Sequence, residues 1–236
     1  MNSLENQIRE LSKITVANND YKKVEKELQL LGKKLITDYV IKIGDITVEP
    51  LWVEAYYSNV KKGFIDPFIH GKEEQAKFGI LYFHHKTDDS RSGVDICLSL
   101  CEGNESKYYL SYLLKYTLVN GEFTTQSQLS AKIRKAYDSL PNKNDILEMS
   151  CNKSETDILG YTTRIGLNVK KSDVEEEIKK RYASLNLAIA KNFDKTYSIE
   201  KKLPHIESLA YSFLSTYDFD KEKWCKEHLG YRLKNI

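Results

Sequence analysis

The residue best suited to chemistry is Glu54, which lies in a short run of aromatic and aliphatic residues, Leu51-Trp52-Val53-Glu54-Ala55-Tyr56-Tyr57. Alternate side chains of an extended strand share a face, so we expect Glu54 beside Trp52 and Tyr56. Aromatic neighbours exclude water from a carboxylate, and desolvation raises a carboxyl pKa toward the range that a general acid or base needs. The alternative is an ordinary surface carboxylate on a strand face that meets solvent.

Two further places carry side chains suited to binding a ligand. In Asp66-Pro67-Phe68-Ile69-His70 the proline restricts the loop, and His70 follows closely enough to bind or orient a ligand. Tyr82 and His84 share one face of the next predicted strand and could form a stacking platform. A structural role is the alternative in both places. His70 could be held by a backbone carbonyl, and Tyr82 and His84 could belong to the core.

A third polar face comes from a strand whose apolar and small polar residues alternate strictly. Such alternation predicts that one face packs inward while the other could line a site. The inward residues are Val94, Ile96, Leu98 and Leu100, and the outward residues are Asp95, Cys97, Ser99 and Cys101.

The sequence favours neither a metal site nor a cofactor site. His84, His85, Cys97 and Cys101 are of the types that bind zinc, but the two histidines are adjacent on a predicted strand and point to opposite faces. The chain has no Gly-rich phosphate loop, no G-x-S-x-G elbow and no H-E-x-x-H motif. We therefore expect no metal and no cofactor.

The candidate residues must be positioned by a sheet with helices before and after it. Residues 3–36 have apolar side chains at helical spacing, with a break at Asn18-Asn19-Asp20, and Gly32 is expected to weaken the end of the second helix. Residues 37–169 form a β-rich core that opens with a hairpin at Gly44-Asp45 and carries the site.

The chain returns to helix after this core. A capping box at Ser172-Asp173-Val174-Glu175 predicts a helix that runs to about residue 191, and residues 170–236 as a whole read as a helical C-terminal extension. Together the segments predict a single α+β domain over residues 1–236, with an antiparallel sheet flanked by N-terminal and C-terminal helices.

Composition excludes several classes of protein. With 236 residues and 41% hydrophobic content, the chain can build a packed core. No apolar run approaches the roughly 18 residues of a membrane-spanning helix, and the first residues lack a signal-peptide pattern, so we predict a cytoplasmic protein without a membrane partner. The net charge of +2 is small for a nucleic-acid binder, so any DNA must be contacted locally.

Read in order, segments within residues 31–168 resemble the alkyladenine (3-methyladenine) DNA glycosylase family, which cuts the N-glycosidic bond of damaged purines. Leu31-Gly32-Lys33-Lys34-Leu35 resembles the family's Leu-Gly helix end, and Val53-Glu54-Ala55-Tyr56 resembles its Glu-Ala-Tyr strand. Asp66 and His70 follow as the family's Asp and His do. The later similar segments are Phe78-Gly79-Ile80-Leu81-Tyr82-Phe83-His84, Gly93-Val94-Asp95-Ile96-Cys97-Leu98-Ser99, Leu113-Leu114-Lys115, Ser127-Gln128-Leu129 and Arg164-Ile165-Gly166-Leu167.

The resemblance implies a glycosylase-like curved sheet and hydrolysis of alkylated or deaminated purine nucleotides that are flipped out of DNA. Glu54 would be the general base that activates water, and Lys115 and Arg164 would contact DNA phosphates. The partner would be DNA containing damaged purines, and we expect a monomer. The substrate-binding residues would be Tyr56, His70, Tyr82, His84 and Ser99.

The chain also departs from the family pattern. His84 replaces a Tyr that stacks on the flipped base, Ser99 replaces the pocket-floor Asn, and Lys115 replaces an Arg. Residues 86–92 hold no aromatic residue where the family carries its intercalating Tyr, and residues 170–236 do not match the family. A catalytically inactive glycosylase-like protein that binds a nucleobase or nucleic acid is therefore the alternative. A third hypothesis is an interaction module that docks through its C-terminal segment.

Overall fold

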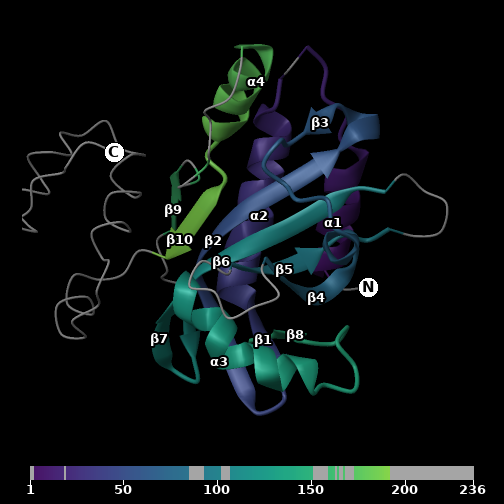
Figure 1. Ribbon diagram of the computed structural model, residues 1–236. Coiled ribbons are helices and arrows are strands. Elements are labelled where there is room, and N and C mark those ends of the chain that lie inside the picture. The colour runs from purple at the N-terminus through teal and green to yellow at the C-terminus, as the bar shows by residue number, and fades with distance from the viewer. Residues whose placement is uncertain are drawn as a thin grey trace, which may run out of the picture.

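The computed structural model describes residues 3–18, 20–84, 93–101, 107–150, 159–162, 164, 167 and 173–191 (Figure 1). The predicted C-terminal segment after residue 191 and the loop at 85–92 lie outside the described residues. The helices are α1 (Ser3–Lys13), α2 (Lys22–Asp38), α3 (Gln126–Asp138) and α4 (Asp173–Ala183), with short 3₁₀ helices η1 (Val60–Lys62) and η2 (Glu73–Ala76). The strands are β1 (Tyr39–Ile43), β2 (Ile46–Asn59), β3 (Phe64–Ile65), β4 (Phe78–Phe83), β5 (Val94–Leu98), β6 (Tyr109–Val119), β7 (Glu122–Thr125), β8 (Leu147–Met149), β9 (Leu159–Thr162) and β10 (Ala188–Lys191).

The strands form one curled sheet that resembles a half-barrel and combines with the helices in an α+β arrangement (Figure 1). Its main path runs β4-β5-β6-β2-β1-β8, and the paired strands are antiparallel. The long β2–β6 pair is its centre, and the register shifts between Pro50 and Val53. Such a bulge bends and twists a strand, which helps the sheet to curl.

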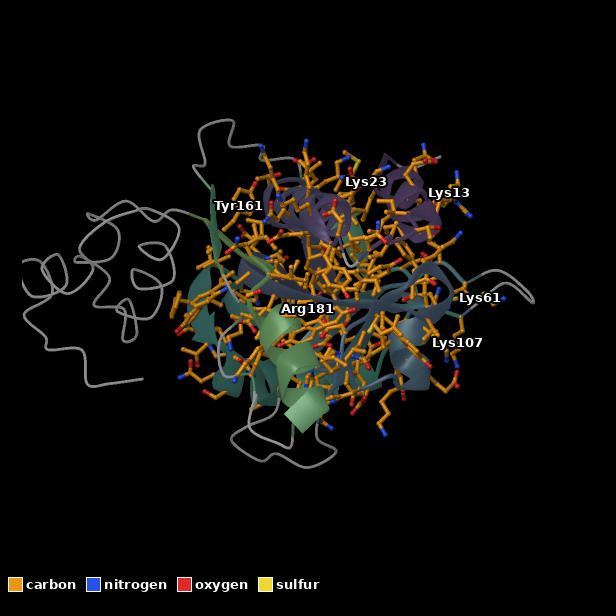
Figure 2. The ribbon with its side chains drawn as sticks, turned by 90° about the horizontal axis from the view of Figure 1, so that it is seen from above. Lys13, Lys23, Lys61, Lys107, Tyr161 and Arg181 are labelled. Carbon is orange, nitrogen blue, oxygen red and sulfur yellow. The ribbon has the colours of Figure 1, made fainter. Side chains whose placement is uncertain are left out.

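The two faces of the sheet have different roles. The main hydrophobic core joins side chains of α1, α2 and α3 to one set of alternating strand residues, including Val53 and Ala55 of β2. Figure 2 shows α1 and α2, with Lys13 and Lys23 projecting from them, on one side of the sheet. Trp52 belongs to a separate cluster with Tyr116, which places it on the opposite face. The predicted alternation along β2 is therefore confirmed.

Gly32 is a point of close approach between α2 and the sheet. A Cβ atom there would lie 2.7 Å from Cδ1 of Ile189 and 3.0 Å from Cε1 of Tyr112. The helix continues through this position to Asp38. The lack of a side chain at Gly32 lets α2 approach β6 and β10.

The C-terminal helix is shorter than its spacing predicts. Its start agrees with the predicted capping box, but α4 ends at Ala183, and Ala188–Lys191 forms β10 between β2 and β9. Ile189, predicted on the helix, is a fully buried strand residue. Hydrogen bonds to two neighbouring strands outweigh the local helical pattern here. No described helix is long and apolar enough to cross a membrane.

Candidate functional site

Four neighbouring strands bring the candidate residues into one row across the sheet. Glu54 of β2 lies opposite Leu113 of β6, Leu113 opposite Asp95 of β5, and Asp95 opposite Tyr82 of β4. Paired residues on neighbouring antiparallel strands project from the same face, so this row belongs to the face away from the main core. The row explains how residues up to 59 positions apart in sequence, Glu54 and Leu113, reach one site.

A cavity of about 410 Å³ opens on this face. Strands β2, β5 and β6 line it together with His84, which directly follows β4, and with the loop after β3, η2 and the first residue of α3. Its volume lies in the range typical of small-molecule sites. The lining residues are Tyr56, Phe68, His70, Gln75, His84, Asp95, Leu113, Lys115, Gln126 and Leu167.

Glu54 lies directly beneath the wall of the cavity. Its side chain is 0% exposed, and its two oxygens face two cavity residues: Oε1 lies 3.8 Å from Nζ of Lys115, and Oε2 accepts a hydrogen bond from the Tyr56 hydroxyl at 3.3 Å. Glu54 is not itself a lining residue. Two cavity residues, Lys115 and Tyr56, therefore connect the cavity to Glu54.

Tyr56 remains a hydrogen-bond donor in this environment. Burial, and secondly the negative charge of Glu54, raise the pKa of its phenol well above the usual value. The phenol therefore keeps its proton and can donate it to the Glu54 carboxylate. The predicted proximity of Glu54 and Tyr56 is confirmed, whereas Trp52 packs on Tyr116 instead of against the cavity.

Three ring side chains cluster at the opposite wall. The ring centres of His70 and His84 are 4.7 Å apart, and that of Tyr82 lies 5.1 Å from His84. Nδ1 of His70 is 3.1 Å from the Tyr82 hydroxyl, whose pKa is raised, first by burial and then by the charge of Asp95, so the hydroxyl can donate to it. The structure thus brings together the predicted trio, with Tyr82 contacting the cavity residue His70 and not itself lining the cavity.

Asp95 is the site residue that motif reasoning did not select. It is 1% exposed and accepts hydrogen bonds from Ser111 Oγ at 2.8 Å and Gln75 Nε2 at 3.2 Å, and Nε2 of His84 lies 2.7 Å from its other oxygen. The strict alternation of residues 94–101 had marked its face as one that could line a site. Gln75 comes from η2 and had no comparable signal.

Arg164 has a structural role in place of the predicted phosphate contact. Its side chain is 0% exposed and forms an ion pair with Asp66, with Nη1 2.5 Å from Oδ2. It also donates to the carbonyl oxygens of Ala55 and Tyr182, and its guanidinium lies 4.8 Å from the ring centre of Tyr56. A planar guanidinium with these partners cannot also reach a phosphate at the surface.

Two other predicted roles also change. Ser99 Oγ donates to the Gln75 carbonyl and accepts from the Leu110 amide, each at 2.7 Å, and Ser99 does not line the cavity. It therefore ties η2 to the sheet instead of forming the pocket floor. Lys115 lines the cavity beside Glu54, so its partner in this structure is a buried carboxylate instead of a phosphate.

A second, larger depression of about 670 Å³ adjoins the first, and His84 lines both. It lies between η2 and α3, along the edge strand β4. Four of its lining side chains are basic and one is acidic, which makes this surface positive. The charged residues are Lys72, Lys77, Arg134, Lys143 and Glu74.

Within the part of the chain that the structure describes, no group of three or more His, Cys, Asp or Glu side chains is placed to hold a metal ion. The chain matches no protein-family model and no curated protein.

Proposed function

We propose that this protein is a purine-DNA N-glycosylase that hydrolyses the N-glycosidic bond of damaged purines, with Glu54 as general base. The observation that carries the proposal is the buried Glu54 carboxylate, held by Lys115 and Tyr56 beneath a cavity with histidine and tyrosine walls. The ordered resemblance of residues 31–168 to the alkyladenine DNA glycosylases supports the same function.

The cavity suits a base that leaves the DNA stack. A damaged purine inside a duplex is inaccessible, so the nucleotide must flip out at a cost of a few kcal/mol. Inside the cavity the rings of Tyr56, His70 and His84 would contact the base. An N-alkylated purine carries a positive charge, and a tyrosine face near such a cation contributes about 0.5 to 2 kcal/mol that a normal base lacks. This difference would favour damaged bases.

Glu54 would act through a water molecule between the cavity and its carboxylate. It would take a proton from this water as the oxygen attacks the sugar C1′ carbon and the base departs. Nζ of Lys115 lies 3.8 Å from Oε1, and the Tyr56 hydroxyl donates to Oε2, so the carboxylate has a defined orientation. This chemistry uses only side chains of the protein and water.

The positive surface between η2 and α3 would contact the DNA backbone. It adjoins the cavity at His84, so phosphates beside a flipped nucleotide would lie near Lys72 and Lys77, which are both exposed. These residues take the place of Arg164 and Lys115 in the predicted DNA contact. A local patch of this kind is consistent with a net charge of only +2.

The test is base release from duplexes that contain 3-methyladenine, 7-methylguanine or hypoxanthine, detected by strand scission in alkali. The native protein should release at least one of these bases, and Glu54→Gln should bind the same duplex but release none. An unchanged melting temperature of Glu54→Gln is the control for folding. Full activity in that variant would refute the role of Glu54.

One observation favours the catalytically inactive alternative, a glycosylase-like protein that binds a nucleobase or nucleic acid. The Glu54 side chain has no exposed surface and does not line the cavity, whereas its neighbours Lys115 and Tyr56 do. This alternative predicts equal binding of damaged and undamaged DNA by the native protein and release of no base.

A further inference from the structure

The pair of His84 and Asp95 has the geometry of an oriented proton donor. Nε2 of His84 lies 2.7 Å from Oδ1 of Asp95, and Oδ2 of the same carboxylate accepts from Ser111 and Gln75. A carboxylate that faces three donors acts only as an acceptor, so Nε2 of His84 must carry its hydrogen. The tautomer of the ring is thereby set by its partner.

The other ring nitrogen of His84, Nδ1, remains available to a ligand. Among the described residues, the ring nitrogens of His84 have one hydrogen-bond partner, which is Asp95 at Nε2. His84 lines the cavity, and its side chain is 19% exposed. An imidazolium carries a hydrogen on Nδ1 as well, which could be donated to a ligand.

His84 and Glu54 also lie on opposite sides of the cavity. Glu54 is on β2 and His84 directly follows β4, with β6 and β5 between them. Three strand spacings correspond to roughly 14 Å between the two backbones, and both side chains belong to the same face of the sheet. A nucleotide between them would have its sugar near one group and its base near the other.

We propose that His84, oriented by Asp95, is the general acid that protonates the departing purine. This inference rests on the proposed glycosylase function. Asp95 is a positioning residue, because it acts through His84. The resemblance supplies no such pair, since the family has a Tyr where this chain has His84.

The reaction is balanced with these two groups and one water. The bond between C1′ and the purine nitrogen breaks, and its electron pair goes to the purine. The Nδ1 proton of His84 passes to a purine ring nitrogen, while Glu54 takes a proton from the attacking water and the new C1′–O bond forms. His84 ends neutral and Glu54 protonated, and solvent returns the proton from Glu54 to His84.

The charge of the leaving base provides the test. A 7-methylguanine base is already cationic and leaves without further protonation, whereas hypoxanthine is neutral and benefits from a general acid. General acid catalysis contributes about 100- to 10,000-fold. We therefore expect His84→Gln to lower the ratio of hypoxanthine release to 7-methylguanine release by about 100-fold, measured in single-turnover reactions on matched duplexes.

Two further variants separate proton transfer from packing. His70→Gln is the matched control, because His70 lies 4.7 Å from His84 between ring centres and its Nδ1 contacts the Tyr82 hydroxyl. It should lower the release of both bases in the same proportion. Asp95→Asn should lower the ratio as His84→Gln does, and ¹⁵N NMR of the His84 ring should show that Nε2 has lost its preference for the hydrogen.

Each result decides the proposal. Equal losses for both bases in His84→Gln would overturn the general-acid role while leaving the glycosylase function intact. Release of 7-methylguanine but not of hypoxanthine by the native protein would likewise overturn the general-acid role and leave the glycosylase function intact. If the native protein releases neither base, the proposed function fails, and this inference fails with it. A normal melting temperature of His84→Gln ensures that the ratio reports chemistry.

Discussion

The Nζ atom of Lys115 lies 3.8 Å from Oε1 of Glu54, whose side chain is completely buried. Lys115 occupies the bulged part of β6, where the register with β2 shifts, and the ammonium group reaches the carboxylate from the cavity wall. A buried carboxylate without a partner is strongly unfavourable, so this pairing is what allows a charged Glu54 to persist beneath the cavity.

Lys115→Met should therefore destabilise the protein, because it removes the cation that lies 3.8 Å from the buried Glu54 carboxylate. We expect a loss of about 3 kcal/mol in the free energy of unfolding, measured by urea denaturation. Adding Glu54→Gln to Lys115→Met should restore much of this loss, since the amide carries no charge. Lys115→Arg, which keeps the cation, is the control. Equal stability of Lys115→Met and the native protein would contradict the pairing.

Removing the exposed lysines of the second depression should weaken DNA binding without changing the fold. Each phosphate contact contributes roughly 0.9 to the slope of log affinity against log salt concentration. If Lys72 and Lys77 each contact a phosphate, Lys72→Ala combined with Lys77→Ala should reduce the slope by about 2. Fluorescence anisotropy with a labelled duplex at several salt concentrations measures this slope.

The control is Lys23→Ala, because Lys23 lies with α1 and α2 on one side of the sheet, outside both cavities (Figure 2). Its slope should equal that of the native protein. If the double variant and Lys23→Ala give the same slope, the positive surface between η2 and α3 does not contact DNA.

Much of the central sheet could be predicted because its signals are local. The hairpin around Gly44 requires a residue at positive φ, and Gly44 has a φ of 59°. Glu54 and Tyr56 meet because alternation along one strand needs no knowledge of the rest of the chain. The polar face that contains Asp95 could also be predicted, because residues 94–101 alternate along one strand.

The remainder of the site depends on contacts between distant residues. Asp66 and Arg164 are 98 positions apart, and their ion pair converts a predicted DNA contact into a structural one. The bond between His84 and Asp95 follows from the pairing of β4 with β5, which the sequence pattern did not specify. Ile189 likewise depends on distant residues. It lies at helical spacing from the apolar residues before it, but pairing with β2 and β9 makes it a strand residue.

Gly79→Ala should destabilise the fold much more than the same change at Gly44. Both glycines have positive φ, at 71° and 59°, which costs an alanine about 1 kcal/mol. At Gly79 a Cβ atom would in addition lie 2.6 Å from the backbone oxygen of Asn144, whereas nothing lies within 4 Å at Gly44. Thermal or urea unfolding of the two variants measures the difference. Similar losses would mean that the backbone at Asn144 moves away easily.

Tyr57 should make the fold sensitive to alkaline pH. Burial raises the pKa of its phenol to about 12, against an ordinary value of 10, and the hydroxyl accepts a hydrogen bond from Asn59 at 3.2 Å. Below pH 10 the phenol is protonated in both states, so its contribution is complete. Between pH 10 and 12 the unfolded chain releases this proton and the folded chain does not, so stability falls as pH rises, by up to about 1.4 kcal/mol per pH unit.

Tyr57→Phe removes both the hydrogen bond and the titration, so its effect should depend on pH. Near pH 8 the variant should be less stable than the native protein by about 1 kcal/mol, because the Asn59 amide loses one of its two acceptors and keeps the Ser12 carbonyl oxygen. Above pH 10 the native protein loses stability that the variant keeps, so the difference should shrink and then reverse. Urea denaturation over this pH range measures the difference, with Tyr109→Phe, a change at a partly exposed tyrosine, as the control. A difference that stays constant with pH would mean that Tyr57 ionises equally easily in the folded and unfolded states.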